Sequence, residues 1–188
     1  MRREALSLLE EQSRQGTVDL FYGDESQVSP AGYVPYGWQF EQEVVCIESA
    51  KGKGLNCFAL INRDSQLIYT TSKENITAQF VVEQLDSFSL RLKKPTVVVL
   101  DNAKAHTAAK VKEQLENWQQ RGLFLFYLPP YSPHLNLAER LWKELKARWL
   151  RPLDYISTDN LFYAVEMALA AVGKQLFINF SDSIYSSK

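Results

Sequence analysis

Short apolar runs that end in an acidic residue are the leading pattern along this chain. Residues 97–100 are all aliphatic, and Asp101 follows them directly. A wholly apolar run of this length is typical of a strand that is buried on both faces of a sheet covered by helices. Open α/β sheets bind ligands at the carboxyl ends of their strands. The pattern therefore predicts a site at Asp101, although an acid in this place can also cap the following helix.

A second run of the same kind lies near the N-terminus. Residues 18–22 are mostly apolar, and Gly23, Asp24 and Glu25 follow. The run predicts a strand that carries Asp24 near its end, and Gly23 permits another part of the backbone to approach closely. The alternative is that the acids belong to a solvated turn.

The rest of the chain alternates between strand and helix periodicity. Apolar runs bounded by turn residues predict strands, and apolar positions spaced three and four apart predict helices. Further strands are predicted at residues 43–47, 55–61, 66–71 and 123–128. Helices are predicted at residues 2–15, 76–90, 103–120 and 158–175, and another helix starts at Asn136.

The order of these elements determines how the strands pair. The strands before residue 76 are joined by short turns, so they should pair antiparallel. A strand that is reached through a crossover helix must pair in parallel. We therefore expect an α/β protein with a mixed sheet and helices on both faces. In this sheet the strands at residues 18–26 and 97–100 can be adjacent and parallel.

This arrangement places Asp24 and Asp101 side by side at one edge of the sheet. Two ionised carboxylates in contact are costly unless a cation neutralises them, and hard oxygen ligands suit Mg²⁺ or Mn²⁺. Glu139 from the facing helix could supply a third carboxylate, although its spacing from Asn136 also fits a capping box. Two such ions would activate an attacking oxygen and stabilise a leaving oxygen at a phosphodiester.

Basic side chains follow Glu139 on the same helix. Residues 140–151 hold five Lys or Arg residues and one acid, in a chain of net charge −1. Lys143 and Lys146 share a helix face with Glu139. Together with Arg140 they are candidates to contact the DNA backbone, because phosphate contacts supply much of the affinity for DNA. The alternative is a solvated charged stripe.

Three ring side chains have two interpretations each. His106 lies five residues after Asp101 and is either a DNA-contacting residue or an ordinary, partly buried histidine. Trp38 and Tyr131 are either stacking platforms for bases or packed residues of the core and loops.

Bulk properties restrict the class of protein. A length of 188 residues suits one domain, and 46% hydrophobic with 23% charged residues is ordinary for a globular protein. The net charge of −1 argues against a general nucleic-acid-coating protein. The sequence has no signal-peptide pattern and no apolar run near the ~20 residues of a membrane span, so we expect a cytoplasmic protein. Cys46 and Cys57 are expected to be buried and reduced.

Three motifs resemble those of the DDE transposases of bacterial insertion sequences in the mariner superfamily. They are Gly-Asp24-Glu-Ser, Val-Leu-Asp101-Asn-Ala-x-x-His106 and Leu-Pro-Pro-Tyr-Ser-Pro-x-Leu-Asn136-x-x-Glu139-x-x-Trp142-x-x-Leu-Lys146. The resemblance covers residues 19–150. It implies a ribonuclease H-like fold with a mixed five-stranded sheet flanked by helices. We expect this DDE catalytic domain at residues 17–188, after a helical leader at residues 1–16.

The resemblance also implies a function. Asp24, Asp101 and Glu139 correspond to the catalytic, metal-binding triad, with two Mg²⁺ ions that Mn²⁺ can replace. The implied reaction is hydrolytic cleavage at the insertion-sequence ends, followed by attack of the freed 3′-OH on target DNA, usually at a TA dinucleotide. Double-stranded DNA and a second copy of the chain on that DNA are the implied partners, in the bacterial nucleoid. The family's N-terminal helix-turn-helix region is missing from this sequence, so we expect it to be supplied in cis or in trans.

Three other functions remain open at this stage. A catalytically silent remnant could bind DNA or a partner transposase, but the presence of all three acids favours an enzyme. A nuclease or junction resolvase could use the same fold, but the proline-rich motif before Glu139 argues for a transposase. A phosphatase with Asp101 as nucleophile fits worse, because such sites want a second Asp two residues on, where Ala103 stands.

Overall fold

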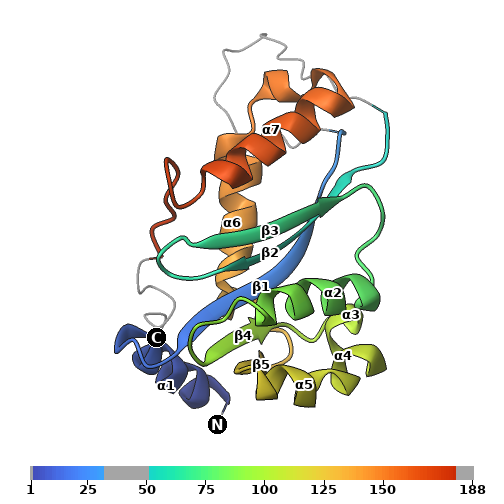
Figure 1. Cartoon of the computed structure of the whole chain (residues 1–188). Helices are drawn as coiled ribbons and strands as arrows, with labels where there is room; N and C mark the ends of the chain where they lie inside the picture. Colours follow the sequence, from blue (N-terminus) through green and yellow to red (C-terminus); the bar gives the residue numbers. More distant parts are fainter. Residues whose placement is uncertain (1, 32–50, 181–188) are drawn as a thin grey trace.

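A five-stranded mixed sheet forms the centre of the computed structural model, which describes residues 2–31 and 51–180 (Figure 1). The strands are β1 (Asp19–Val28), β2 (Leu55–Ile61), β3 (Leu67–Ser72), β4 (Thr96–Leu100) and β5 (Leu123–Tyr127). Their order in the sheet is β3-β2-β1-β4-β5. The β1–β2 and β2–β3 pairs are antiparallel, whereas β1–β4 and β4–β5 are parallel. The predicted mixed sheet is confirmed, including the parallel pairing of β1 with β4.

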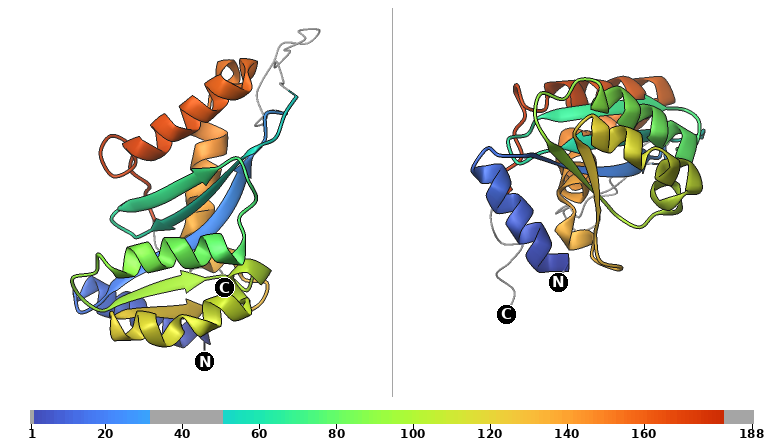
Figure 2. Two further views of the ribbon diagram at one scale, coloured as in Figure 1. Left: turned by 45° about the vertical axis from the view of Figure 1, so that its right-hand side comes forward. Right: turned by 60° about the horizontal axis from the view of Figure 1, so that its bottom comes forward.

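Helices cover both faces of this sheet (Figures 1 and 2). One face carries α1 (Arg2–Arg14), α6 (Leu137–Glu144) and α7 (Thr158–Ala171). The other carries α2 (Ala78–Ser89), α3 (Lys104–Thr107), α4 (Ala109–Glu113) and α5 (Leu115–Gln120). A π-helical turn, η2 (Leu145–Trp149), continues α6, and 3₁₀ turns lie at η1 (Pro133–Leu135) and η3 (Pro152–Ile156).

Alternate residues of β1 enter two separate hydrophobic cores, because successive side chains of a strand point to opposite faces. Leu20 and Tyr22 pack in the core beneath α6 and α7. Phe21 packs in the core beneath α2 and the α3–α5 segment, where its ring meets Phe88 edge to face. This alternation directs Asp24 towards the α6 side of the sheet and Glu25 towards the α3 side.

The prediction of one helix over residues 103–120 is wrong, because the segment forms three short helices. Ala108 has extended backbone angles (φ −60°, ψ 155°) and separates α3 from α4. His106, Val111 and Trp118 are all fully buried. At about 100° per residue, Val111 and Trp118 share one side of a helix, whereas His106 lies more than about 100° away from both. A break between residues 106 and 111 lets all three side chains turn inwards.

Two further boundaries differ from the expectation. The strand predicted at residues 123–128 ends at Tyr127, and as an edge strand it buries Leu123 but leaves Phe124 40% exposed. The last helix ends at Ala171 and not near residue 175. The strand expected at residues 43–47, and the side chains of Trp38 and Cys46, lie outside the described residues.

Among residues 2–31 and 51–180, no helix is long and apolar enough to cross a membrane. Cys57 is buried with a free thiol, as expected. Burial, followed by the neighbouring Glu166 carboxylate, raises the pKa of this thiol to about 12. Cys57 is therefore an inert core residue.

Candidate active site

Asp24 and Asp101 occupy corresponding positions on two parallel strands. The register pairs Asp19 with Thr96 and continues to Tyr22 with Val99. Continued by two residues, it aligns Asp24 with Asp101 at the carboxyl end of β4. Parallel strands keep such positions adjacent, so the predicted juxtaposition of the two acids follows directly from the observed register.

Gly23 brings a third element up to this edge of the sheet. Its carbonyl oxygen accepts a hydrogen bond of 3.1 Å from Nδ2 of Asn136, which stands at the start of α6. A Cβ at residue 23 would lie 2.6 Å from a Leu100 methyl carbon and 2.9 Å from one of Leu60. The glycine is therefore needed for packing on one face of β1, while its carbonyl anchors α6 on the other.

Glu139 lies in the first turn of α6 and faces solvent. Asn136 caps this helix, as predicted, by accepting the Ala138 N–H at 3.1 Å. The predicted capping box is not formed, because the Asn136 N–H donates to the Pro133 carbonyl at 2.8 Å. Glu139 instead lines a cavity of about 440 Å³ together with Asp101.

Asp24 is 8% exposed and lies in an unfavourable environment for a charge. Burial, then the carboxylates of Glu139, Glu25 and Asp101, raises its pKa to about 7. A divalent cation bound between these groups would reverse that penalty, because an opposite charge favours the ionised form. The donor set of hard oxygen atoms is one that Mg²⁺ and Mn²⁺ accept.

The three carboxylates are neighbours but do not form a closed cage. Within residues 2–31 and 51–180, no three His, Cys, Asp or Glu side chains lie close enough together to hold a metal ion. Asp101 and Glu139 line the cavity, whereas Asp24 is not among its lining residues. The structure therefore brings the three predicted residues to one place without assembling a complete ligand set.

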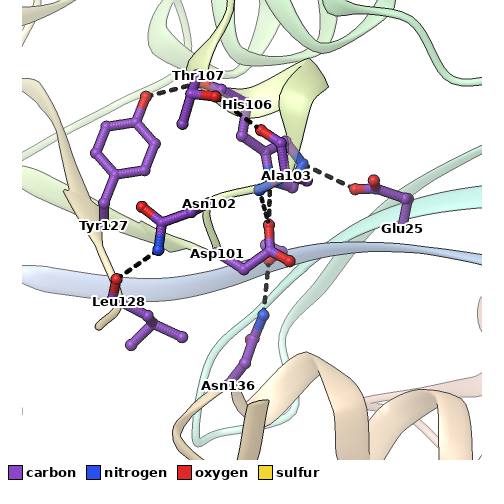
Figure 3. A network of polar contacts seen from close by, with 10 residues as sticks. Glu25, Asp101, Asn102, Ala103, His106, Thr107, Tyr127, Leu128 and Asn136 are labelled. Atoms are coloured by element: carbon purple, nitrogen blue, oxygen red, sulfur yellow. Dashed lines mark hydrogen bonds and ion pairs between the residues drawn. The ribbon is translucent and has the colours of Figure 1, made fainter. Parts of the chain in front are cut away.

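The Asp101 carboxylate is held by two hydrogen bonds, both to Oδ1 (Figure 3). The Ala103 N–H donates at 2.9 Å, and Nδ1 of His106 lies 2.7 Å away. The hydrogen bond from His106 is the main cause that lowers the pKa of Asp101. This lowered pKa means that Asp101 is ionised at neutral pH, and its side chain is 46% exposed.

His106 is fully buried and lies between two carboxylates. Its Nε2 lies 2.8 Å from Oε2 of Glu25, and its carbonyl accepts the Tyr127 hydroxyl at 2.8 Å. Burial lowers the pKa of His106, but the hydrogen bonds with Asp101 and Glu25 outweigh it and raise the pKa to about 9. The ring is thus an internal cation whose nitrogens face protein acids, and this placement does not support its predicted contact with DNA.

The basic residues of α6 and η2 differ in their surroundings. Lys143 is exposed and Arg140 is half-buried. Both line a second hollow, of about 480 Å³, which shares Glu139 and Asn136 with the first cavity. A trough therefore runs from Asp101 past Glu139 to these cations.

Lys146 points back towards β1, where its Nζ donates to the Ser26 hydroxyl at 2.7 Å. Burial lowers the pKa of Lys146, against the opposing effects of Cys57, Glu139 and Asp24. Its ammonium group therefore lies within the electrostatic field of the carboxylates. The sequence pattern placed it on an exposed stripe with Lys143 and did not indicate this inward direction.

Comparison with known proteins identifies the family. A family model described as DDE superfamily endonuclease matches residues 19–161. The chain belongs to the DDE endonuclease superfamily. No curated protein matches this DDE endonuclease sequence.

Solved structures with the same fold include chains of recombination complexes. The intasome of simian T-cell lymphotropic virus in complex with PP2A regulatory subunit B56 gamma matches with a TM-score of 0.59 and 15% identity, over 90% of this chain and 55% of that chain. The catalytic core domain of BIV integrase matches with a TM-score of 0.52 and 16% identity, over 85% of this chain and 86% of that chain. The Mos1 transposase paired-end complex matches with a TM-score of 0.52 and 18% identity, over 92% of this chain and 61% of that chain. These matches confirm the ribonuclease H-like fold of this superfamily member, which spans 55% of the intasome chain and 61% of the Mos1 chain.

Glu25 is the residue of this site that sequence reasoning missed. In the sequence it is the second acid after an apolar run, and this pattern gives it no role of its own. Its available signal is its position: it follows Asp24 on β1 and therefore points to the opposite face of the sheet. Only the fold shows that His106 lies on that face.

Proposed function

We propose that this DDE endonuclease is the catalytic domain of a transposase that cleaves DNA at the ends of a mariner-type bacterial insertion sequence and transfers the strand to a target. The observation that carries the proposal is the register of β1 and β4, which aligns Asp24 with Asp101, with Glu139 facing the same cavity from α6. Asp24, Asp101 and Glu139 are the proposed catalytic residues.

The same three residues are the proposed ligands of Mg²⁺ or Mn²⁺. The raised pKa of Asp24 supports this role, because the clustered carboxylates are ionised at lower cost beside a cation. Two bound ions would activate the attacking oxygen and stabilise the leaving oxygen at the scissile phosphate. The protein's own contribution is to hold Asp24 on β1, Asp101 just after β4 and Glu139 on α6 near one another. Asp101 and Glu139 line the cavity.

Double-stranded DNA is the proposed substrate, both as element ends and as a target, for which we propose TA. Arg140 and Lys143 in the second hollow are the proposed phosphate contacts, with Lys146 closer to the carboxylates. Tyr131 supports a contact with bases, because it is fully exposed on the rim of the cavity. Specific recognition of the ends is proposed to require a helix-turn-helix region in cis or in trans, and a second copy of the chain on the DNA.

Nicking of supercoiled plasmid with Mn²⁺ tests this function. The wild type should convert supercoiled DNA to open circles, whereas Asp24→Asn, Asp101→Asn and Glu139→Gln should each reduce the rate by 10²-fold or more. Asp159→Asn is the matched control, because Asp159 is an exposed acid on α7 outside the site. Near-normal nicking by any one of the three site variants would remove that residue from the triad.

A silent DNA-binding module is the second candidate, because the described carboxylates do not form a closed ligand set. It predicts binding to duplex DNA, measured by fluorescence anisotropy, without nicking by the wild type. Addition of a helix-turn-helix region in trans separates the two functions. Nicking that appears on addition supports the enzyme, whereas its continued absence supports the silent module.

A further inference from the structure

A chain of three polar side chains links β1 to the end of β4 behind the proposed metal site. Glu25 Oε2, the His106 ring and Asp101 Oδ1 follow one another with contacts of 2.8 and 2.7 Å (Figure 3). His106 is 0% exposed. Glu25 is the chain neighbour of Asp24, and it reaches the opposite face of β1. The linkage therefore connects the strand that carries Asp24 with the side chain of Asp101.

The chemistry of this linkage makes it stiff. Nδ1 of the ring hydrogen-bonds Asp101 Oδ1, and Nε2 lies 2.8 Å from Glu25 Oε2 as an ion-pair contact. Hydrogen bonds to a carboxylate are shorter and stronger than those between neutral groups. The Phe58 ring meets the imidazole edge to face at 6.3 Å, and the Tyr127 hydroxyl holds the His106 carbonyl. The ring therefore has little freedom to rotate.

The stiff linkage determines which Asp101 oxygen faces the cavity. His106 and the Ala103 N–H both occupy Oδ1, and they approach it from α3 and its N-terminal end. The Asp101 side chain is half-exposed and lines the cavity with Glu139. Oδ2 is consequently the oxygen that is free to bind a cation there.

We propose that Glu25 and His106 are positioning residues, which lock the rotamer of Asp101 and thereby set the affinity of the site for its divalent cation. The inference rests on the proposed function, since it assumes that Asp101 is a metal ligand. Partners that orient a metal ligand typically change metal affinity by about 10- to 100-fold when they are removed. Neither residue touches the substrate or the metal in this role.

A purely structural role is the competing explanation, because a buried histidine also needs its hydrogen bonds for stability. The two explanations differ in what a substitution changes. His106→Leu removes the hydrogen bond with Asp101 and the ion-pair contact with Glu25, whereas His106→Asn restores a donor near the position of Nδ1 and loses only the contact with Glu25. Thr107→Val is the matched control, because it removes the 3.1 Å hydrogen bond to the Ala103 carbonyl and keeps both groups that donate to Asp101 Oδ1.

The test is calorimetric titration of the wild type and these variants with Mn²⁺, with thermal unfolding in EDTA as the measure of stability. We expect His106→Leu to weaken Mn²⁺ binding at least tenfold and His106→Asn to recover most of that loss. Glu25→Ala should also weaken Mn²⁺ binding, and this residue is less buried than His106. Glu25→Gln keeps an oxygen acceptor for His106 and should retain most of the Mn²⁺ affinity. Thr107→Val should lower the unfolding temperature and leave Mn²⁺ affinity within twofold of the wild type.

Two results would overturn the inference in distinguishable ways. If the wild type binds Mn²⁺, Asp24→Asn abolishes that binding, and Glu25→Ala and His106→Leu bind as the wild type does, the positioning role fails and the proposed function stands. If Mn²⁺ binding is the same in the wild type and Asp24→Asn, the metal site itself is wrong and both proposals fail. Should His106→Leu not fold, Glu25→Ala and Glu25→Gln decide the outcome alone.

Discussion

At the scale of one residue, the negative charge of Asp24 destabilises the fold, because this carboxyl group is buried among other acids. A carboxyl group whose pKa rises from 3.8 to about 7 on folding binds more protons in the native state than in the unfolded chain. Stability therefore falls as pH rises from about 4 to about 7, and the loss is complete above pH 7. At 1.36 kcal/mol per pKa unit, the full loss is about 4 kcal/mol.

We accordingly expect Asp24→Asn to be more stable than the wild type by up to about 4 kcal/mol at pH 8 in EDTA. The advantage should shrink as pH falls and approach zero only below about pH 3, where Asp24 is protonated in both states. Urea denaturation across this pH range measures it, and added Mn²⁺ should stabilise the wild type alone. An advantage that does not vary with pH would show that the amide improves packing and that the charge on Asp24 is not the cause.

Gly23 gives a second prediction for a single residue. Gly23→Ala should destabilise the protein by about 1–3 kcal/mol, because the new methyl group overlaps side-chain carbons of Leu100 and Leu60 in a packed core. Gly52→Ala is the control, since among the described residues a methyl group there meets the Thr158 hydroxyl at 3.2 Å and the Pro30 ring at 4.0 Å. Chemical denaturation of both variants should show a larger loss in the free energy of unfolding for Gly23→Ala. Equal losses would mean that the side chains around residue 23 move to accommodate the methyl group.

The site residues differ in how far the sequence could predict them. Asp24 and Asp101 follow apolar runs, so the strand pattern alone brings them to the ends of buried strands. The partnership of Glu25 with His106 depends on where α3 lies against the face of β1 that Glu25 takes, and no local pattern encodes the place of α3. The sequence also does not show that Lys146 points inwards, because its direction depends on the position of Ser26 on β1.

The basic residues of α6 and η2 give a prediction at the scale of the element. Lys143 is exposed beside the hollow, so Lys143→Ala should weaken binding to duplex DNA and reduce the slope of log K against log salt by about 0.9. Lys146→Ala should change this slope less and reduce nicking more, because its ammonium group lies among the carboxylates. Lys112→Ala, an exposed site on α4, is the control and should change neither. Equal slopes for Lys143→Ala and the wild type would assign Lys143 to the solvated stripe.

Helix periodicity predicted where helices occur better than whether each helix is unbroken. The α6 segment was recognised because its apolar positions and the Asn136 cap agree. The segment at residues 103–120 has an equally good helical composition, yet burial of His106 beside Glu25 requires a different phase from burial of Val111 and Trp118. A tertiary contact therefore overrides a local preference, and only the assembled sheet shows where.

At the scale of the whole molecule, element order was sufficient to predict the mixed sheet, because turn-linked strands and crossover helices leave few ways to pair. The division into a leader at residues 1–16 and a domain at residues 17–188 remains a prediction. In the structure α1 contributes Leu6 to the core beneath α6 and α7. Glu10 in the same helix is buried and accepts hydrogen bonds of 2.7 Å from Tyr22 and Arg63.

This contact of Glu10 yields the test of the division. Arg63, in the turn between β2 and β3, also donates to the Phe180 carbonyl at 3.2 Å, so one guanidinium joins α1, the sheet and the C-terminal segment. If α1 is an integral part of the domain, Glu10→Ala should lower the free energy of unfolding by about 2–3 kcal/mol, because it breaks hydrogen bonds between a buried carboxylate and its partners. The free energy of unfolding from urea denaturation is the measurement.

Glu11→Ala is the control for this prediction, since Glu11 pairs with Arg14 on the exposed side of α1 and should contribute less than about 1 kcal/mol. A double-mutant cycle with Arg63→Ala should give a coupling of about 1–3 kcal/mol with Glu10 and none with Glu11. A detachable leader would make Glu10→Ala as mild as Glu11→Ala. In that case the helix could be replaced by a DNA-binding region without loss of the fold, whereas strong coupling means that any such region must be joined ahead of an intact α1.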